Sequence, residues 1–119
     1  MSHEFLDFNE DMLDAADKAE ILVDGVTFEE FEADFRINFA VVRALEIIGE
    51  ATKRMPNEIR HKYPALPWQG MAGMRDGVIH GYDIVDLQLV WDTVCFDLPI
   101  IKPQLRQILA DYANLPGTN

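Results

Sequence analysis

The chain has 119 residues, 49% of them apolar and 26% charged, which suits one folded domain and is too short for two. This composition excludes a disordered chain, no apolar run could span a membrane, and the start of the sequence is acidic rather than basic like a signal peptide, so we expect a soluble, cytoplasmic protein. A single cysteine, Cys95, excludes an intrachain disulfide, and no spacing of cysteine and histidine predicts a metal site.

The net charge of −11 is concentrated in the first part of the chain. Residues 1–34 hold twelve acidic residues and one basic residue, Lys18, whereas residues 35–119 hold nine of each sign. An acidic surface disfavours nucleic acid, because phosphate backbones bind to positive charge. Residues 36–75, however, hold seven basic and three acidic side chains, so a polyanion can meet a favourable local field there.

The first predicted element is an acidic amphipathic helix over residues 5–24. Its apolar residues recur at steps of three and four, which define one helical stripe: Phe5, Phe8, Met12, Ala15, Ala19 and Leu22. The pair Asp24-Gly25 ends this helix. Thr27, followed three residues later by Glu30, has the spacing of a capping box and predicts a short second helix.

The longest predicted helix begins near Asp34 and runs for about twenty residues. Its apolar stripe consists of Ile37, Val41, Leu45, Ile48 and Met55. Gly49 lies inside this helix, where a glycine costs about 1 kcal/mol relative to alanine. We therefore expect Gly49 to allow the close approach of another helix.

The second half of the chain predicts further helices and no strand. A motif helix is expected over about residues 68–81 with Gly81 as its C-cap, and another over 86–97. Pro99 and Pro103 are expected to break or bend the chain before a last helix near 105–112, and residues 113–119 to form a flexible tail. The prediction is an all-α, up-and-down bundle of about five helices in one domain spanning residues 1–119.

The segment RDGVIHGY at residues 75–82 combines side chains suited to phosphodiester chemistry. On a helix, Asp76 and His80 share a face, so the carboxylate would orient the imidazole. Arg75 would hold phosphate oxygens, and a histidine with a pKa of about 6.5 transfers protons near neutrality. The spacing alone also fits a purely structural arrangement, with Arg75 in a salt bridge, His80 capping carbonyls and Tyr82 covering the edge of the core.

Four blocks of the sequence together resemble the HepT-like branch of the HEPN superfamily. In chain order they are LEIIGEA at 45–51, KYPALPW at 62–68, MRDGVIHGY at 74–82 and VWDTVCFDLP at 90–99, and the resemblance covers roughly residues 5–112. It implies an all-helical HEPN-type bundle that pairs as a two-fold homodimer. The R-x4-H elements of both protomers would then converge on one cleft.

The resemblance also implies a function and a role for each motif residue. It implies a metal-independent endoribonuclease toxin without a cofactor, from a type VII-like toxin–antitoxin system, whose partner is an MntA-type nucleotidyltransferase antitoxin. By position, Arg75 and His80 match the catalytic pair, and Tyr82 matches the tyrosine that the partner modifies with AMP. Asp76 stands where asparagine is common, and Asp83 where an aromatic residue is usual, so both are departures from the pattern.

Four basic residues precede the motif helix and form a candidate surface for steering RNA: Lys53, Arg54, Arg60 and Lys62. The alternative is an ordinary solvated face. Trp68 and Trp91 are expected to anchor the core, and Met71 and Met74 to form packing surface, including a dimer interface.

A second function remains open from the sequence. The acidity of the chain and the aspartate at position 76 favour a non-catalytic helical partner subunit of a nucleotidyltransferase. In that reading the acidic first helix is a solvated face or meets a basic patch on the partner.

Overall fold

The computed structural model describes residues 3–76, 79–80 and 84–113, and it describes Asp76, Ile79, His80 and Ile84 by their backbone alone. Its elements are α1 (Phe5–Val23), α2 (Phe28–Ala33), α3 (Phe35–Lys53), α4 (Asn57–Lys62), α5 (Trp68–Asp76), β1 (Ile79–His80), β2 (Ile84–Val85), α6 (Leu87–Asp92), the π-helical turn η1 (Thr93–Asp97) and α7 (Leu98–Ala113).

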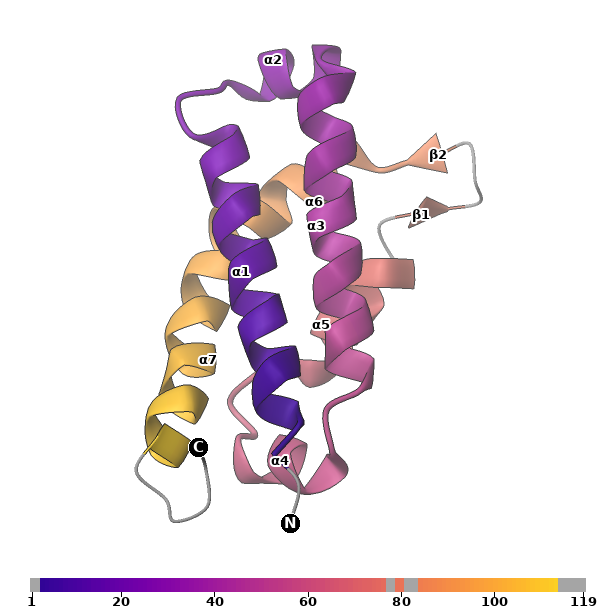
Figure 1. Cartoon of the computed structure of the whole chain (residues 1–119). Helices are drawn as coiled ribbons and strands as arrows, with labels where there is room; N and C mark the ends of the chain where they lie inside the picture. Colours follow the sequence, from indigo (N-terminus) through magenta and orange to yellow (C-terminus); the bar gives the residue numbers. More distant parts are fainter. Residues whose placement is uncertain (1–2, 77–78, 81–83, 114–119) are drawn as a thin grey trace.

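The all-α bundle predicted from the sequence is confirmed. Helices α1 and α3 lie side by side in opposite directions, α5 packs on α3, and α7 returns along α1, so that both ends of the described chain lie at the same end of the bundle (Figure 1). The short helices α2 and α4 form the corners between the long ones. None of the described helices has the length and apolarity needed to cross a membrane.

The core lies where the predicted stripes of α1 and α3 meet. Met12, Val41, Leu45 and Ile48 are almost completely buried. One buried polar side chain ties the neighbouring α7 to α1. Asn9 of α1 donates to the carbonyl oxygen of Leu105 in α7 at 2.8 Å, and a buried donor without an acceptor would be costly. The two long helices are therefore held by burial of the faces that the sequence predicts.

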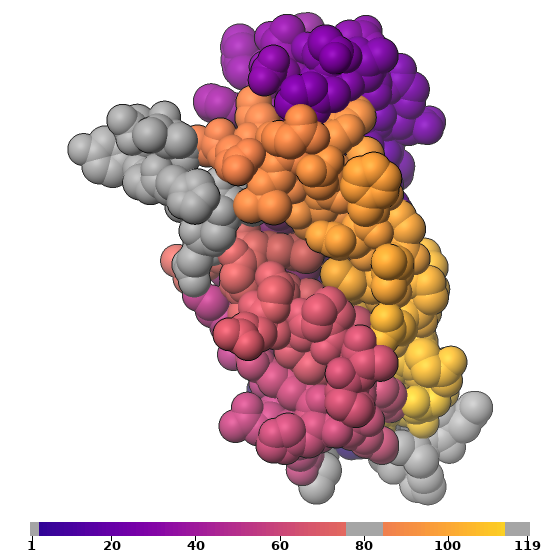
Figure 2. Space-filling model, turned by 180° about the vertical axis from the view of Figure 1, so that it is seen from behind, coloured from indigo at the N-terminus to yellow at the C-terminus, as the bar shows by residue number. Residues whose placement is uncertain are grey.

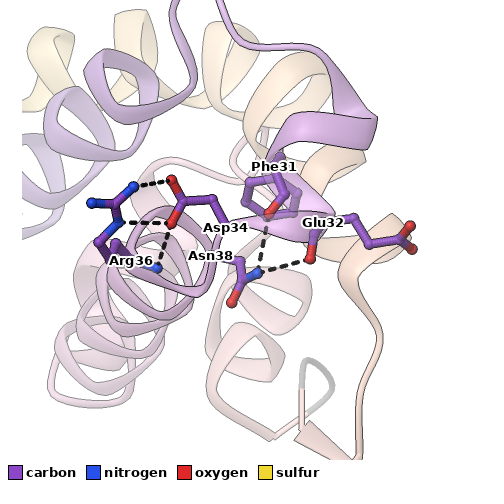
Figure 3. A network of polar contacts seen from close by, with 5 residues as sticks. All are labelled: Phe31, Glu32, Asp34, Arg36 and Asn38. Carbon is purple, nitrogen blue, oxygen red and sulfur yellow. Dashed lines mark hydrogen bonds and ion pairs between the residues drawn. The ribbon is translucent and has the colours of Figure 1, made fainter.

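A polar network at the α2–α3 corner fixes the start of α3 (Figure 3). The carboxylate of Asp34 caps α3 by accepting from the backbone N–H of Arg36 at 3.0 Å and also pairs with its guanidinium. The buried side-chain amide of Asn38 donates to the carbonyl oxygens of Phe31, at 3.0 Å, and Glu32, at 3.3 Å. These bonds satisfy carbonyls at the C-terminal end of α2, which has no further helical turn to accept them.

The predicted capping box and core tryptophans are also present. The Thr27 side chain accepts from the N–H of Glu30 at 3.1 Å, and the Glu30 carboxylate accepts from the N–H of Thr27 at 3.0 Å. Trp68 is buried and donates to the carbonyl oxygen of Tyr63 at 2.9 Å. Trp91 is partly buried against the rings of Phe28 and Phe31.

Of the predicted break or bend at Pro99 and Pro103, the break is wrong, because α6, η1 and α7 follow one another without interruption. A proline has no N–H and its ring crowds the preceding turn. The π-helical turn Thr93–Asp97 lies just before Pro99, and the N–H of Leu98 bonds to the carbonyl oxygen of Thr93, five residues back. This wider turn makes room for the proline ring, so the helix continues.

The predicted motif helix over residues 68–81 is too long, because α5 ends at Asp76. Beyond it β1 pairs with β2 as a two-residue antiparallel ladder, with Ile79 opposite Val85 and His80 opposite Ile84. The sequence offers a reason: glycine follows Asp76, and the β-branched pair Val78-Ile79 favours extended backbone. Gly81, the predicted C-cap, lies outside the described residues.

Candidate active site

Arg75 is held at a close contact between α3 and α5. A Cβ atom added to Gly49 would lie 2.6 Å from the backbone nitrogen of Arg75, 2.8 Å from its Cβ and 3.2 Å from the carbonyl oxygen of Ala72. Only glycine permits this approach. The expectation that Gly49 serves the close packing of helices is therefore confirmed, and the residue that it admits is the predicted catalytic arginine.

The Arg75 side chain forms an ion cluster with two residues of α3. A carboxylate oxygen of Glu50, Oε1, lies 3.7 Å from Nε of Arg75 and 4.0 Å from Nη1 of Arg43. All three side chains are between two-fifths and two-thirds exposed, so solvent can reach them. We call Arg43, Glu50 and Arg75 the arginine cluster.

Glu50 belongs to the candidate site through its ion pair with Arg75, and it was not predicted from the sequence. It follows Gly49 within the LEIIGEA block, but it is separated from Arg75 by 25 positions along the chain. The close helix packing expected at Gly49 could have indicated it. A residue next to a glycine at a helix contact lies close to the helix that packs there, and Glu50 is next to Gly49. Periodicity within one helix could not identify the partner.

The structure changes the expected relation between Asp76 and His80. The two residues do not share a helix, because His80 lies in β1 after the end of α5. The argument that a common helical face lets Asp76 orient the imidazole is therefore wrong. The backbone of His80 is placed in the hairpin that follows Arg75, and Tyr82, which lies between the two strands, falls outside the described residues.

The basic residues proposed to steer RNA lie around the end of α3 and on α4, and they take part in contacts within the chain. Arg60 donates to the carbonyl oxygens of Thr52, at 2.6 Å, and Met55, at 3.3 Å. Arg54 lies over the ring of Phe8.

The other two members of this set are Lys62 of α4 and Lys53 of α3. Lys62 donates to the hydroxyl of Tyr112 at 3.2 Å and lies 4.8 Å above its ring. Lys53 ends α3 and is exposed. This surface therefore fastens the end of the bundle as well as carrying positive charge.

An apolar groove of about 450 Å³ separates α5 from α6, η1 and α7. The face on which these elements meet is seen in Figure 2. Met71 and Met74, predicted as packing surface, are buried in the core of the chain itself and line this groove from the α5 side. Leu89 and Ile100 line it from the other side and are exposed, at 42% and 64%.

The acidic face of α1 is partly neutralised within the chain. Lys102 of α7, whose side chain is only 14% exposed, pairs with Asp17 and Glu20, and Arg106 lies 3.8 Å from Asp17. Hydrogen bonds to the two carboxylates raise the pKa of Lys102. Asp17 and Glu20, part of the acidic face that was expected to be solvated or to meet a partner, therefore hold α1 to α7.

Comparison with known proteins shows the family of the chain. A family model described as "Ribonuclease HepT-like" matches residues 12–108. A Thermococcus cleftensis protein named "Probable ribonuclease HepT" is 41% identical over 108 residues, which is 91% of this chain and 98% of the relative.

Two further relatives carry names that describe them as candidate RNases. One, from Methanocaldococcus jannaschii, is 43% identical over 85% of this chain and 84% of its own length. The other, from Caldanaerobacter subterraneus, is 44% identical over 73% of this chain and 78% of its own length. No solved structure gives a significant match.

Proposed function

The chain belongs to the HepT-like ribonuclease family, and we propose that it is a metal-independent endoribonuclease toxin of a type VII-like toxin–antitoxin system. The observation that carries this proposal is the arginine cluster. The LEIIGEA block of α3 supplies Gly49 and Glu50, and these two residues meet Arg75, the arginine of the R-x4-H element. Blocks far apart in the sequence thus converge on the residue expected to bind the reacting phosphate.

The proposed reaction needs only side chains of this chain and the RNA itself. The imidazole of His80 removes the proton from a ribose 2′-hydroxyl, and the 2′-oxygen forms a bond to the adjacent phosphorus while the bond to the 5′-oxygen breaks. A proton passes to the departing 5′-oxygen. Arg75 stabilises the negative charge on the phosphorane-like transition state, and the products carry a 2′,3′-cyclic phosphate and a 5′-hydroxyl.

We further propose that the active unit is a two-fold homodimer. Support comes from the apolar groove beside α5, whose exposed rim residues Leu89 and Ile100 would be covered in a dimer. A two-fold axis near the arginine cluster would bring two histidines together, so that one acts as base and the other as acid. Sedimentation equilibrium should give twice the chain mass, and a monomer at micromolar concentration would contradict this proposal.

Silencing is proposed to act through Tyr82. An MntA-type nucleotidyltransferase in the same cytoplasm would transfer AMP to its hydroxyl and add bulk and negative charge two residues from His80, which repels an RNA phosphate. The test is bacterial growth with the toxin and the nucleotidyltransferase expressed together. Tyr82→Phe should stay toxic beside the active partner, and silencing of this variant would show that the covalent step is unnecessary.

The alternative function is a non-catalytic helical subunit of a nucleotidyltransferase. The observation that favours it is the use of Arg60 and Lys62 as structural donors, which reduces the cationic surface left for RNA on a chain of charge −11. Expression of the chain alone separates the two functions. A toxin arrests growth, whereas a subunit is harmless and still gains the mass of AMP beside its partner.

The ribonuclease proposal is tested with purified protein and labelled RNA in EDTA. Wild type should leave 2′,3′-cyclic phosphate ends. These ends are recognised because a phosphatase does not remove the cyclic phosphate. His80→Ala and Arg75→Ala should each lose about 100-fold or more in kcat, the size usual for a lost acid–base group or a lost charge stabiliser. Activity that survives in His80→Ala would overturn the assignment.

A further inference from the structure

We propose that Glu50 is a positioning residue for Arg75 and holds its guanidinium in the orientation that meets the phosphate under attack. This inference rests on the proposed ribonuclease function. Gly49 fixes the backbone of Arg75 against α3, but a half-exposed arginine side chain still has several rotatable bonds. An anchor within the site is needed to select one orientation.

The geometry of the contact suits an anchor. Oε1 of Glu50 lies 3.7 Å from Nε, the inner nitrogen of the Arg75 guanidinium. An arginine offers two edges for planar, two-bond contacts, and the edge formed by the two terminal nitrogens can bind a phosphate in this way. A carboxylate on the Nε side can therefore hold the plane while leaving the outer edge for RNA.

The charges of the arginine cluster predict how a positioning role of Glu50 would differ from a purely electrostatic one. Arg43 and Arg75 both face the same carboxylate oxygen, so the cluster keeps a net positive charge. Exposed ion pairs contribute little to folding stability, so the fold does not require Glu50. The carboxylate also repels a phosphate and weakens the binding of RNA before reaction. A group that costs affinity in the ground state and orders Arg75 in the transition state will affect kcat and KM in different ways.

The first measurement is steady-state cleavage of one RNA by Glu50→Gln and by a matched control, Glu46→Gln. Glu46 lies one turn earlier on α3, and no ion pair involving it is found among the described residues. We expect Glu50→Gln to lower kcat about tenfold while KM stays constant or falls, because order is lost and positive charge is gained. Glu46→Gln should change both constants less than about twofold. An unchanged or higher kcat for Glu50→Gln would overturn the proposal.

The second measurement asks through which residue Glu50 acts. In an Arg75→Ala background, Glu50→Gln should have no further effect on kcat, because the side chain that it positions is gone. In an Arg43→Ala background the tenfold loss should persist. A loss that persists without Arg75 would mean that Glu50 acts on the RNA directly, and a loss that disappears without Arg43 would assign its effect to Arg43. Either result overturns the positioning of Arg75.

The third measurement does not depend on catalysis. The ¹⁵N–¹H resonance of the Arg75 Nε group, assigned with an Arg75→Lys variant, should shift and broaden in Glu50→Gln and stay unchanged in Glu46→Gln. If wild type cleaves no RNA, the ribonuclease proposal fails, and this spectrum alone decides whether Glu50 holds Arg75. An unchanged resonance in Glu50→Gln would show that it does not.

Discussion

Gly49 shows how one missing side chain determines where the proposed catalytic arginine, Arg75, lies. In a helix interior, Gly49→Ala would normally add about 1 kcal/mol of stability. Here the new Cβ would meet backbone and Cβ atoms of Arg75 at less than 3 Å, and overpacking of this kind costs about 1–3 kcal/mol. We expect Gly49→Ala to unfold at lower urea concentration than wild type and to lose activity, because α5 must move away from α3.

Gly73 provides the matched control for this experiment. It lies in α5, and an added Cβ would meet no atom within 4 Å. Gly73→Ala should therefore unfold at the same or higher urea concentration, with a gain of up to about 1 kcal/mol. If Gly49→Ala proved as stable as Gly73→Ala, the close contact at Arg75 would not be what requires glycine.

A second prediction at the scale of residues concerns pH. Tyr63 donates to the carboxylate of Asp111 at 2.7 Å and links the loop before α5 to α7. This bond and a second from Gln107 lower the pKa of Asp111 below its ordinary 3.8, while burial and then Asp111 raise the pKa of Tyr63 well above its ordinary 10.0. A lowered carboxyl pKa stabilises the fold above pH 3.8, and a raised phenol pKa stabilises it below pH 10.

The expected result is a difference in melting temperature that depends on pH. Between about pH 4 and pH 10 the melting temperature of wild type should be higher than that of Asp111→Asn. This difference in melting temperature should shrink as the pH falls below 3.8, because the wild-type carboxylate then takes up a proton. Tyr63→Phe should show the same loss in the middle range. A constant difference down to pH 2 would contradict a contribution from the charged carboxylate.

At the scale of elements, the polar contacts between α2 and α3 fix where α3 begins, and α3 is the helix that carries Gly49 and Glu50. Asn38 is buried and its amide is the donor that two carbonyls of α2 share. Asn38→Ala leaves these acceptors without a partner, which should lower the free energy of unfolding by about 1–3 kcal/mol. Asn38→Asp should be worse at neutral pH, because it places a carboxylate against two carbonyl oxygens.

Chemical denaturation of both variants measures this order. At acidic pH the two variants should differ less in their free energy of unfolding, because a protonated aspartate at position 38 can again donate a hydrogen bond. Asn38→Asp as stable as wild type at pH 7 would mean that the corner does not depend on this donor.

At the scale of the whole molecule, basic residues proposed to bind RNA also stabilise the fold. Arg60 is tied to the end of α3, so Arg60→Gln should lower the free energy of unfolding by about 1–2 kcal/mol. Arg54 is exposed over Phe8, so Arg54→Gln should leave stability within about 0.5 kcal/mol.

If Arg54 steers RNA, its loss should raise KM and reduce the salt dependence of kcat/KM by about one unit of log–log slope. Cleavage rates from 50 to 200 mM salt, measured for both variants, separate the two roles. Equal salt slopes for Arg54→Gln and wild type would remove Arg54 from the RNA surface.

The sequence by itself determined the features that depend on neighbouring residues. Apolar periodicity located α1 and α3, the Thr27–Glu30 spacing located the cap of α2, and four ordered blocks indicated the family that the comparisons show. These signals are local, because a helix and its cap are specified within a few turns of chain. Gly49 belongs to the same group, since its cost in a helix predicted a contact before the partner was known.

Only the tertiary structure decided which residues meet and where the motif helix ends. Helix α5 stops at Asp76, so Arg75 lies on a helix and His80 on a strand, although the motif reads as one continuous helical stretch. Glu50 meets Arg75, 25 positions further along the chain, through the contact at Gly49. Periodicity identifies the buried face of a helix but not the residue that packs on it, because that choice depends on how the whole bundle closes.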